Sequence, residues 1–363
     1  MMRTKPFDCG NSCDRKLYCD YLRIVATIAV MLIHTSGHIT SQVVCSPVEV
    51  FVMTFFSGIS GCCIPIFVMI SGALLIPRDV SLKDLHGRRI LRILVAFLFW
   101  SFFYAGVFPL FHLVFEKSYH SSLTAVLTDA ININSHFHLW YLPMTIGLYL
   151  CLPLFKKIVE SETLTYYFLL LFFVFSSAIP TTFSVLSVLL RSSPDDTLHN
   201  LQTIINYIDV NAVIGYSGYF ILGFVLSTTQ ISRRQRYLIY AFGITGFLVS
   251  LTLRLFVSPR IESQVGNFSI SALLLSSAVF VLFKYTQRNN YNSGTIAKRL
   301  SKYSFGAYLL HLFVLTVLEI IGIDGIPVSP LSLFSIELLC VVLLSFALSS
   351  LINKIPFLQK WIV

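Results

Sequence analysis

Long apolar segments dominate this 363-residue chain, and ten of them are about as long as a helix that crosses a lipid bilayer. Such a helix needs about 20 mostly apolar residues. Only 12% of the residues are charged, whereas an ordinary soluble protein has about 25%. The sequence therefore predicts an all-α polytopic membrane protein. The predicted spans run near residues 17–36, 48–76, 90–111, 139–155, 164–179, 210–226, 237–256, 270–283, 303–321 and 331–352.

The distribution of Lys and Arg between these spans predicts the orientation of the chain. If the N-terminus lies in the cytoplasm, nearly all of the 26 basic residues fall in cytoplasmic segments. The exceptions are Arg23, inside the first span, and Lys117, Arg191, Arg254 and Arg260 on the outer side. By the positive-inside rule we expect a bundle of about ten transmembrane helices with both termini cytoplasmic. Residues 1–16 are then a cytoplasmic segment of one transmembrane domain, 1–363, without an appended soluble domain.

Neither the net charge nor the cysteines indicate another class of protein. A net charge of +9 suits a nucleic-acid-binding protein only where basic residues cluster, and here they are scattered between apolar segments. The eight cysteines include Cys9, Cys13 and Cys19 near the N-terminus, without the spacing of a zinc site. We therefore expect no nucleic-acid partner, no metal and inert reduced thiols.

The first predicted span carries ionisable residues. The segment LYCDYLRIVATIAVMLIHTSGH contains Arg23 and His34, eleven residues apart. On an α-helix these side chains differ by about 20° around the axis and by about 16 Å along it. Asp20 and Thr27 lie within about 60° of Arg23, and His38 lies one turn beyond His34. The sequence thus predicts a polar stripe from the cytoplasmic end of the span into the outer half of the membrane.

Two interpretations of this stripe remain open. An ionisable group inside a span costs about 3 kcal/mol on insertion scales and persists mainly where it lines a cavity or a reaction path. That cost favours a functional stripe. Alternatively, Asp20 and Arg23 form an interfacial pair that reaches water, and His34 donates a hydrogen bond to a neighbouring helix.

A second group of charges lies at the inner end of the third predicted span, in LHGRRILRILVAF. On an ideal helix Arg89 and Arg92 are one turn apart and Arg88 and Arg92 are at i,i+4, so guanidinium groups project to the same side. Guanidinium groups bind phosphate through two parallel hydrogen bonds. The alternative is that these arginines anchor the span on anionic lipid.

Five motifs, in order along the whole chain, resemble those of the acyltransferase 3 family of membrane O-acyltransferases. They are DYLRIVATIAVMLIH, the Arg-x-x-Arg of Arg89 to Arg92, IPIFVMISGALL, HLWYLPMTIGLYLCLPLF and SKYSFGAYLLHLF. Val68 stands where phenylalanine is more usual. The chain is most similar to the short enterobacterial type without an attached esterase domain, of which an O-acetyltransferase of the enterobacterial common antigen is an example.

The resemblance implies an acyltransferase of the bacterial inner membrane that moves an acetyl group from cytoplasmic acetyl-CoA to a sugar hydroxyl. The acceptor would be a cell-surface glycan, such as the O-antigen of lipopolysaccharide or the common antigen, or its lipid-linked precursor. Acetyl-CoA is then a substrate, and no further cofactor is expected. A sugar hydroxyl needs a base with a pKa near 7, which suits His34, although a transient acyl-histidine remains an alternative. Arg23, Arg89 and Arg92 would bind the donor.

Several further residues are weaker candidates for the site. Asp20 supports Arg23, and His311 in the ninth span can orient the acceptor or be a packed histidine satisfied by Tyr308 or Ser304. His138 and Trp140 lie at the outer end of the fourth span, where an aromatic belt is expected in any case.

Two other classes of protein also place ionisable residues inside the membrane. A secondary transporter or flippase uses His and Arg for proton coupling, but its spans usually form related halves, and none is evident here. A membrane scaffold uses polar residues only to hold helices together. Transfer of labelled acetyl groups separates the enzyme from both.

Overall fold

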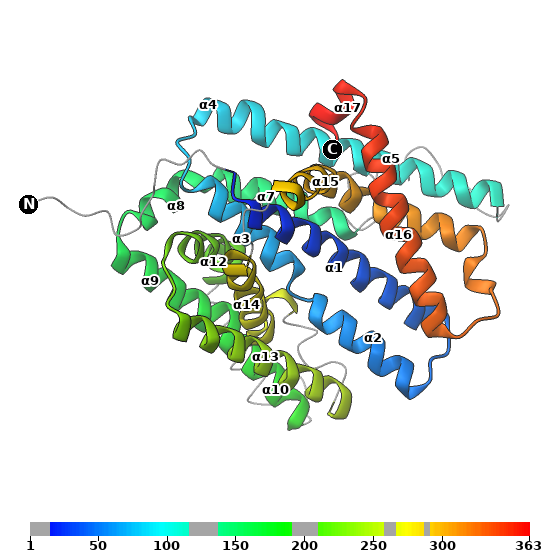
Figure 1. Cartoon of the computed structure of the whole chain (residues 1–363), viewed down its shortest axis with the longest axis horizontal. Coiled ribbons are helices and arrows are strands. Elements are labelled where there is room, and N and C mark those ends of the chain that lie inside the picture. The colour runs from blue at the N-terminus through cyan, green and yellow to red at the C-terminus, as the bar shows by residue number, and fades with distance from the viewer. Residues whose placement is uncertain (1–14, 116–136, 191–209, 258–265, 287–290) are drawn as a thin grey trace, which may run out of the picture. The chain divides into compact units, whose positions relative to one another are not determined.

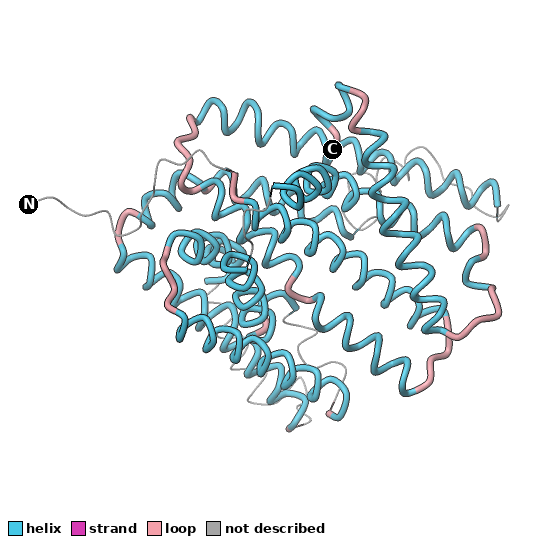
Figure 2. The backbone as a smooth tube through the Cα atoms, in the orientation of Figure 1, coloured by secondary structure: helices cyan, strands magenta, loops and turns pink. Residues whose placement is uncertain are grey.

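Helices form all the regular secondary structure in the part of the chain that the structure describes. The structure is a computed structural model that describes residues 15–115, 137–190, 210–257, 266–286 and 291–363, and no strand occurs in these ranges (Figures 1 and 2). Seven helices in the described ranges are long and apolar enough to cross a membrane, or eight if a pair interrupted at Cys151 is one span. The predicted all-α polytopic membrane protein is therefore confirmed, while the count of ten stays a prediction.

The chain divides into two units. The first comprises Met1–Arg78 and Leu152–Lys298, and the second comprises Asp79–Cys151 and Arg299–Val363. The helices of the first unit are α1 (Leu17–Gln42), α2 (Pro47–Ser60), α3 (Cys63–Leu75), α8 (Leu152–Val159), α9 (Glu162–Leu171), η4 (Phe172–Ala178), α10 (Ile179–Leu189), α12 (Val210–Thr228), α13 (Arg233–Phe256), η5 (Gly266–Phe268) and α14 (Ile270–Thr286). Those of the second are α4 (Leu82–Asp84), η1 (Leu85–Ile90), α5 (Leu91–Phe115), η3 (Phe137–Trp140), α7 (Tyr141–Leu150), most of α15 (Tyr291–Ile320), η6 (Ile323–Gly325), α16 (Pro330–Ile352) and α17 (Pro356–Trp361).

Helices α3 and α12 pack with their backbones in direct contact at the centre of the first unit. A Cβ atom placed on Gly72 would lie 1.8 Å from the carbonyl oxygen of Phe220. On the facing helix, a Cβ on Gly223 would lie 2.1 Å from the carbonyl oxygen of Met69. Small residues allow this approach, as they do at many contacts between membrane helices.

We expect Gly72→Ala to destabilise the first unit strongly. The added methyl group must push two helix backbones apart, and overpacking of this kind typically costs about 1–3 kcal/mol. Gly147→Ala is the matched control, because a Cβ on Gly147 meets nothing within 4 Å. Thermal unfolding in detergent should show a lower midpoint for Gly72→Ala alone. Equal midpoints for the two variants would contradict the backbone contact.

Basic side chains cap several helix ends at one end of the first unit. Lys284, at the end of α14, donates to the carbonyl oxygens of Leu226 and Thr229, each at 2.7 Å, where α12 ends. Lys16, at the start of α1, donates to the carbonyl oxygen of Ala73 at 3.3 Å, near the end of α3. Cations are favourable at helix C-termini because they satisfy orphan carbonyls and offset the helix dipole. Lys16 and Lys284, which the positive-inside rule assigns to the cytoplasm, therefore lie at the same end of the unit.

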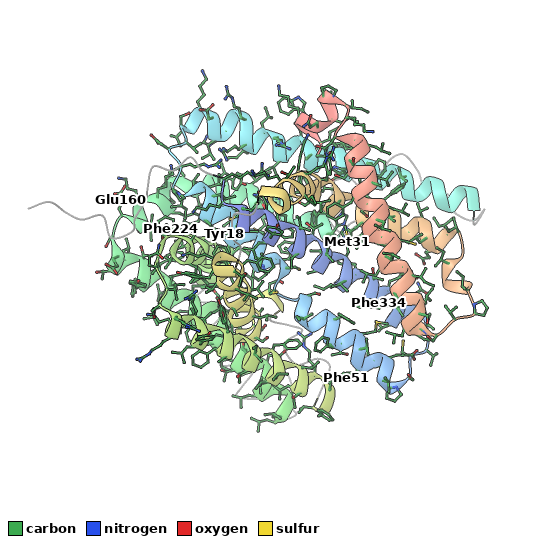
Figure 3. All side chains as sticks on the ribbon, viewed as in Figure 1. Tyr18, Met31, Phe51, Glu160, Phe224 and Phe334 are labelled. Carbon is green, nitrogen blue, oxygen red and sulfur yellow. The ribbon has the colours of Figure 1, made fainter. Side chains whose placement is uncertain are left out.

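Helix α13 presents a large apolar surface. Its exposed side chains include Leu238, Phe242, Ile244, Leu248 and Val249, each between 51% and 59% exposed. Side chains such as Met31 and Phe224, labelled in Figure 3, are instead fully buried in the same unit. Contiguous exposed apolar surface is rare in soluble monomers and is typical of a lipid-facing helix.

In the second unit, the C-terminal residues pack against α5. The indole Nε1 of Trp100 donates to the carbonyl oxygen of Ile362 at 3.1 Å, and Trp100 itself is buried. Ile362 and Val363 are also buried, and α17 contacts α5. The last residues of the chain are thus part of the packed second unit.

Two predicted boundaries are wrong. The fifth predicted span ends near residue 179 and is followed by a polar loop from residue 181, but the helical path continues through η4 and α10 to Leu189. Pro180 fits there because it lies in the first turn of α10, where its missing N–H is not needed. Helix α15 begins twelve residues before the predicted start at 303. Lys117, Arg191 and Arg260 lie outside the described residues, as do residues 1–14.

Candidate functional site

The predicted polar stripe lies on a single helix. α1 runs without interruption over 26 residues from Leu17 to Gln42, so the ideal geometry that places Arg23 and His34 on one face applies. Both side chains are partly exposed, whereas neighbouring apolar residues such as Leu22 and Met31 are fully buried. The structure thus confirms the helix on which the candidate base and the candidate donor-binding arginine are placed. Their roles stay predictions.

Asp20 is held mainly by an arginine that the sequence analysis did not single out. The carboxylate is 2% exposed and accepts two hydrogen bonds from Arg15, at 2.7 Å from Nε and 3.0 Å from Nη2. Arg23 is farther away, with its Nη1 atom 3.6 Å from Oδ1 of Asp20. The predicted Asp20–Arg23 contact exists, but the bidentate contact of Asp20 is with Arg15. The sequence gives no sign of this contact, because Arg15 lies just before α1 and helical spacing rules apply only to residues on one helix.

Thr27 is not part of an open polar track. It is fully buried, and its hydroxyl donates to the carbonyl oxygen of Arg23, one turn earlier, at 2.8 Å. This hydrogen bond within the helix satisfies the hydroxyl. The exposed part of the stripe is therefore limited to Arg23 near the start of α1 and to His34 and His38 toward its end.

The arginine cluster of the second unit lies on a π-helical turn. η1 spans Leu85–Ile90 and joins α5 directly. Because a π turn is wider than an α turn, the ideal spacing that placed Arg88 and Arg89 relative to Arg92 does not apply unchanged. Arg88 is exposed and pairs with Asp84, with 3.4 Å between Nε and Oδ1, while Arg89 is partly exposed. Single π turns occur often at functional sites.

Arg92 contacts the C-terminal segment of the same unit. Its Nη2 atom donates to the carbonyl oxygen of Val363 at 2.5 Å. The guanidinium group has five donor hydrogens, so one such contact leaves capacity for a phosphate. The predicted role of Arg92 in donor binding stays a prediction, and the structure adds a structural role in holding the last residues against α5.

The structure brings His138 and His311 together inside the second unit. Their ring centroids are 5.4 Å apart, and the residues are 2% and 0% exposed. The hydroxyl of Tyr308 donates to the carbonyl oxygen of His138 at 2.5 Å. Nδ1 of His311 lies 2.5 Å from the carbonyl oxygen of Tyr308, which assigns the Nδ1–H tautomer. Both histidines are predicted site residues, but they lie on separate predicted spans, and no sequence pattern links them.

Two tyrosines complete this histidine cluster. The ring of Tyr104, from α5, meets the ring of His138 edge to face with centroids 5.2 Å apart, and its hydroxyl donates to the carbonyl oxygen of Leu309 at 2.6 Å. Tyr141 contacts Tyr308 in the same manner at 5.9 Å. Of the two predicted partners of His311, Tyr308 is in contact and Ser304 donates to the carbonyl oxygen of Ser301 instead. Tyr104 gave no signal in the sequence, because aromatic residues are frequent throughout.

The candidate residues fall into both units. Asp20, Arg23 and His34 belong to the first, and Arg89, Arg92, His138 and His311 belong to the second. Within the described ranges, no three His, Cys, Asp or Glu side chains are arranged to hold a metal ion.

The helices are long and apolar, and several expose the apolar surface that is typical of contact with lipid. Some of them also carry ionisable residues, which is typical of membrane enzymes and transporters. A family model described as an acyltransferase domain matches residues 16–354. The chain belongs to the acyltransferase 3 family, so it is a membrane acyltransferase with acyl donor and acceptor substrates. No curated protein and no solved structure matches it significantly.

Proposed function

We propose that the protein is an O-acetyltransferase of the bacterial inner membrane that transfers acetyl from cytoplasmic acetyl-CoA to a sugar hydroxyl. The acceptor is a cell-surface glycan, of the O-antigen or common-antigen kind, or its lipid-linked precursor. The observation that carries the proposal is that α1 places Arg23 and His34 on one face of one membrane helix in a chain that belongs to an acyltransferase family. Ten spans and two cytoplasmic termini are part of the proposal.

His34 acts as the general base. The sugar hydroxyl oxygen attacks the thioester carbonyl carbon while the imidazole of His34 takes its proton. The C–S bond then breaks, and the imidazolium of His34 returns the proton to the leaving CoA sulfur, so that the products are the sugar ester and free CoA thiol. A neutral histidine suits this role because its ordinary pKa is close to the working pH.

Arg23, Arg89 and Arg92 bind and orient the donor. Coenzyme A carries several phosphate oxygens, and guanidinium groups bind such oxygens through paired hydrogen bonds. All three arginines lie at the cytoplasmic ends of their helices in the proposed orientation, which is the side from which acetyl-CoA arrives. Asp20 accepts two hydrogen bonds from Arg15 and lies 3.6 Å from Arg23, and Arg23 extends the positive lining from the phosphates toward the thioester.

The His138–His311 cluster supports acceptor binding. Both rings are buried beside tyrosines in the second unit, and a buried ionisable group in a membrane helix is a functional candidate by default. His311 is the alternative base if His34 is not catalytic. A transporter or flippase is the competing function, but membership of the acyltransferase 3 family favours an acyltransferase.

Membranes that contain the protein should transfer labelled acetyl groups from acetyl-CoA to glycan. Vesicles from a strain that expresses the protein are incubated with radiolabelled acetyl-CoA, and the glycan fraction is counted. Vesicles from the deletion strain are the control, and mass spectrometry of the glycans from both strains identifies the acylated sugar. A glycan fraction whose label and mass do not depend on the protein would reject the proposal and favour the transporter.

A further inference from the structure

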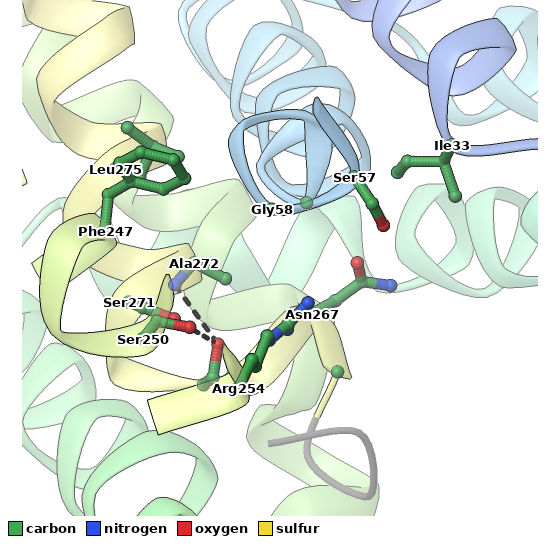
Figure 4. A pocket seen from close by; sticks show the side chains of 13 residues that line it. Ile33, Ser57, Gly58, Phe247, Ser250, Arg254, Asn267, Ser271, Ala272 and Leu275 are labelled. Atoms are coloured by element: carbon green, nitrogen blue, oxygen red, sulfur yellow. Dashed lines mark hydrogen bonds between the residues drawn. The ribbon is translucent and has the colours of Figure 1, made fainter. Parts of the chain in front are cut away.

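A pocket of about 350 Å³ lies within the first unit, apart from the residues assigned above (Figure 4). Its walls come from α1, α2, α13, η5 and the start of α14. Pockets for small molecules usually measure about 300–1,000 Å³, so this one accommodates one or two sugar rings and is too small for coenzyme A. The polar lining residues are Ser57, Ser250, Arg254, Asn267, Ser269 and Ser271.

The lining combines one positive charge with hydroxyl and amide groups. Among the lining residues that the structure describes, Arg254 is the one that carries a charge. Figure 4 shows the side chains of Arg254, Asn267 and Ser57 directed toward one another. Serine hydroxyls and asparagine amides both donate and accept hydrogen bonds, as sugar hydroxyls require, and a guanidinium group selects an oxyanion. The chemistry of the lining therefore fits a sugar that carries a negative charge.

The polar groups of the pocket are held in place by their neighbours. Asn267 donates from Nδ2 to the hydroxyl of Tyr216 at 2.9 Å, and its backbone carbonyl oxygen accepts from the hydroxyl of Tyr219 at 2.6 Å. The hydroxyl of Ser269 lies 2.9 Å from that of Ser271 and accepts from the N–H of Ala272 at 3.2 Å. Polar groups fixed before binding lose little entropy when a ligand binds.

The pocket lies at the end of the unit opposite to the basic caps. Arg254 is in the last turn of α13, whose first turn contains Arg233 and Arg234. Asn267 and Ser269 precede α14, whose last turn contains Lys284. In the proposed orientation this is the outer side. Ile33, the residue directly before His34 on α1, lines the pocket, so the pocket adjoins the helix segment that carries the proposed base.

We propose that this pocket binds the acceptor and that Arg254 selects acidic sugars, those that carry a carboxylate or a phosphate. The role as an acceptor site rests on the proposed function, whereas binding of an acidic sugar is measurable without any acetyl transfer. Arg254 would bind the oxyanion while the serine and asparagine groups bind ring hydroxyls. A neutral sugar lacks the charge-assisted contact and binds more weakly.

Sugar binding is measured by calorimetry on the full chain in phosphatidylcholine nanodiscs. The probes are glucuronate, glucose 1-phosphate, glucose and glycerol 3-phosphate. We expect both acidic sugars to bind at least about tenfold more tightly than glucose, since a hydrogen bond to a charged group contributes about 1.5–3 kcal/mol. Arg254→Gln should remove this preference. Arg233→Gln, at the other end of the same helix, is the matched control and should retain it.

Two results would overturn the proposal. One is equal affinity for glucose and the acidic sugars in the wild type. The other is binding of glycerol 3-phosphate as tight as that of glucose 1-phosphate, which would identify a phospholipid headgroup site instead. If Arg254→Gln does not fold, Ser57→Phe fills the pocket from α2 and should abolish binding of both acidic sugars, and unchanged binding in that variant would also reject the proposal.

Failure of this proposal is distinguishable from failure of the proposed function. If acidic sugars bind in an Arg254-dependent manner but no acetyl group is transferred, the proposed binding pocket is supported and the proposed transferase activity is rejected. If acetyl transfer proceeds while neither acidic sugar binds, the proposed transferase activity is supported and the proposed acidic-sugar pocket is rejected.

Discussion

His34→Gln is expected to lower acetyl transfer at least about 100-fold while the protein still inserts and binds acetyl-CoA. Positioned general bases contribute roughly 10²- to 10⁴-fold in rate, and glutamine retains hydrogen-bonding capacity while it loses the titratable nitrogen. His34 is partly exposed on an uninterrupted helix, so glutamine fits without a change in packing. The measurements are the rate of labelled acetyl transfer in vesicles and the acetyl-CoA dissociation constant of the purified variant.

His38→Gln is the matched control for this experiment. His38 is one turn farther along α1 and is also partly exposed, so the same chemical change is made outside the proposed reaction. We expect near wild-type transfer from this variant. Loss of a general base lowers the rate by more than about tenfold. If His34→Gln retained more than about a tenth of the activity, His34 would not be the base, and His311 would be the next candidate.

Features that depend on local sequence were predictable. The apolar period and length of the first span define α1, and the structure confirms one helix that carries both Arg23 and His34. The small residues Ser71 and Gly72 are typical of close contacts between membrane helices, and Gly72 packs against the backbone of Phe220. Both features follow from helical geometry, because rise and rotation per residue are the same wherever the helix lies.

Features that depend on distant residues were not predictable. The contact of His138 with His311 joins residues 173 positions apart, and the contact of Arg92 with Val363 joins residues 271 positions apart. Single-sequence periodicity predicts which face of a helix is apolar but not which helix packs against it. The candidate pocket illustrates the same limit, since its polar lining comes from three separate segments.

The π-helical turns are a second source of error. η4 lies inside the fifth predicted span, and η1 lies directly before the third, where the predicted arginine spacing is that of an α-helix. One wider turn rotates every residue that follows it relative to those before it. The predicted alignment of Arg88 and Arg89 with Arg92 assumed an unbroken α-helix, and η4 allowed the fifth span to continue past Pro180 to Leu189. Local sequence carries no rule that places such turns.

Arg89→Lys is expected to weaken acetyl-CoA binding roughly 10- to 100-fold without lowering stability. Lysine keeps the charge but loses the paired hydrogen bonds to phosphate, and a hydrogen bond to a charged group contributes about 1.5–3 kcal/mol. Arg92→Lys should weaken binding similarly and also lower the unfolding midpoint, because Arg92 holds the carbonyl oxygen of Val363. Calorimetry with acetyl-CoA and thermal unfolding separate the two effects, and Arg234→Lys, exposed on α13, is the control. Unchanged acetyl-CoA affinity in both variants would reject donor binding by these arginines and favour anchoring of the helix on anionic lipid.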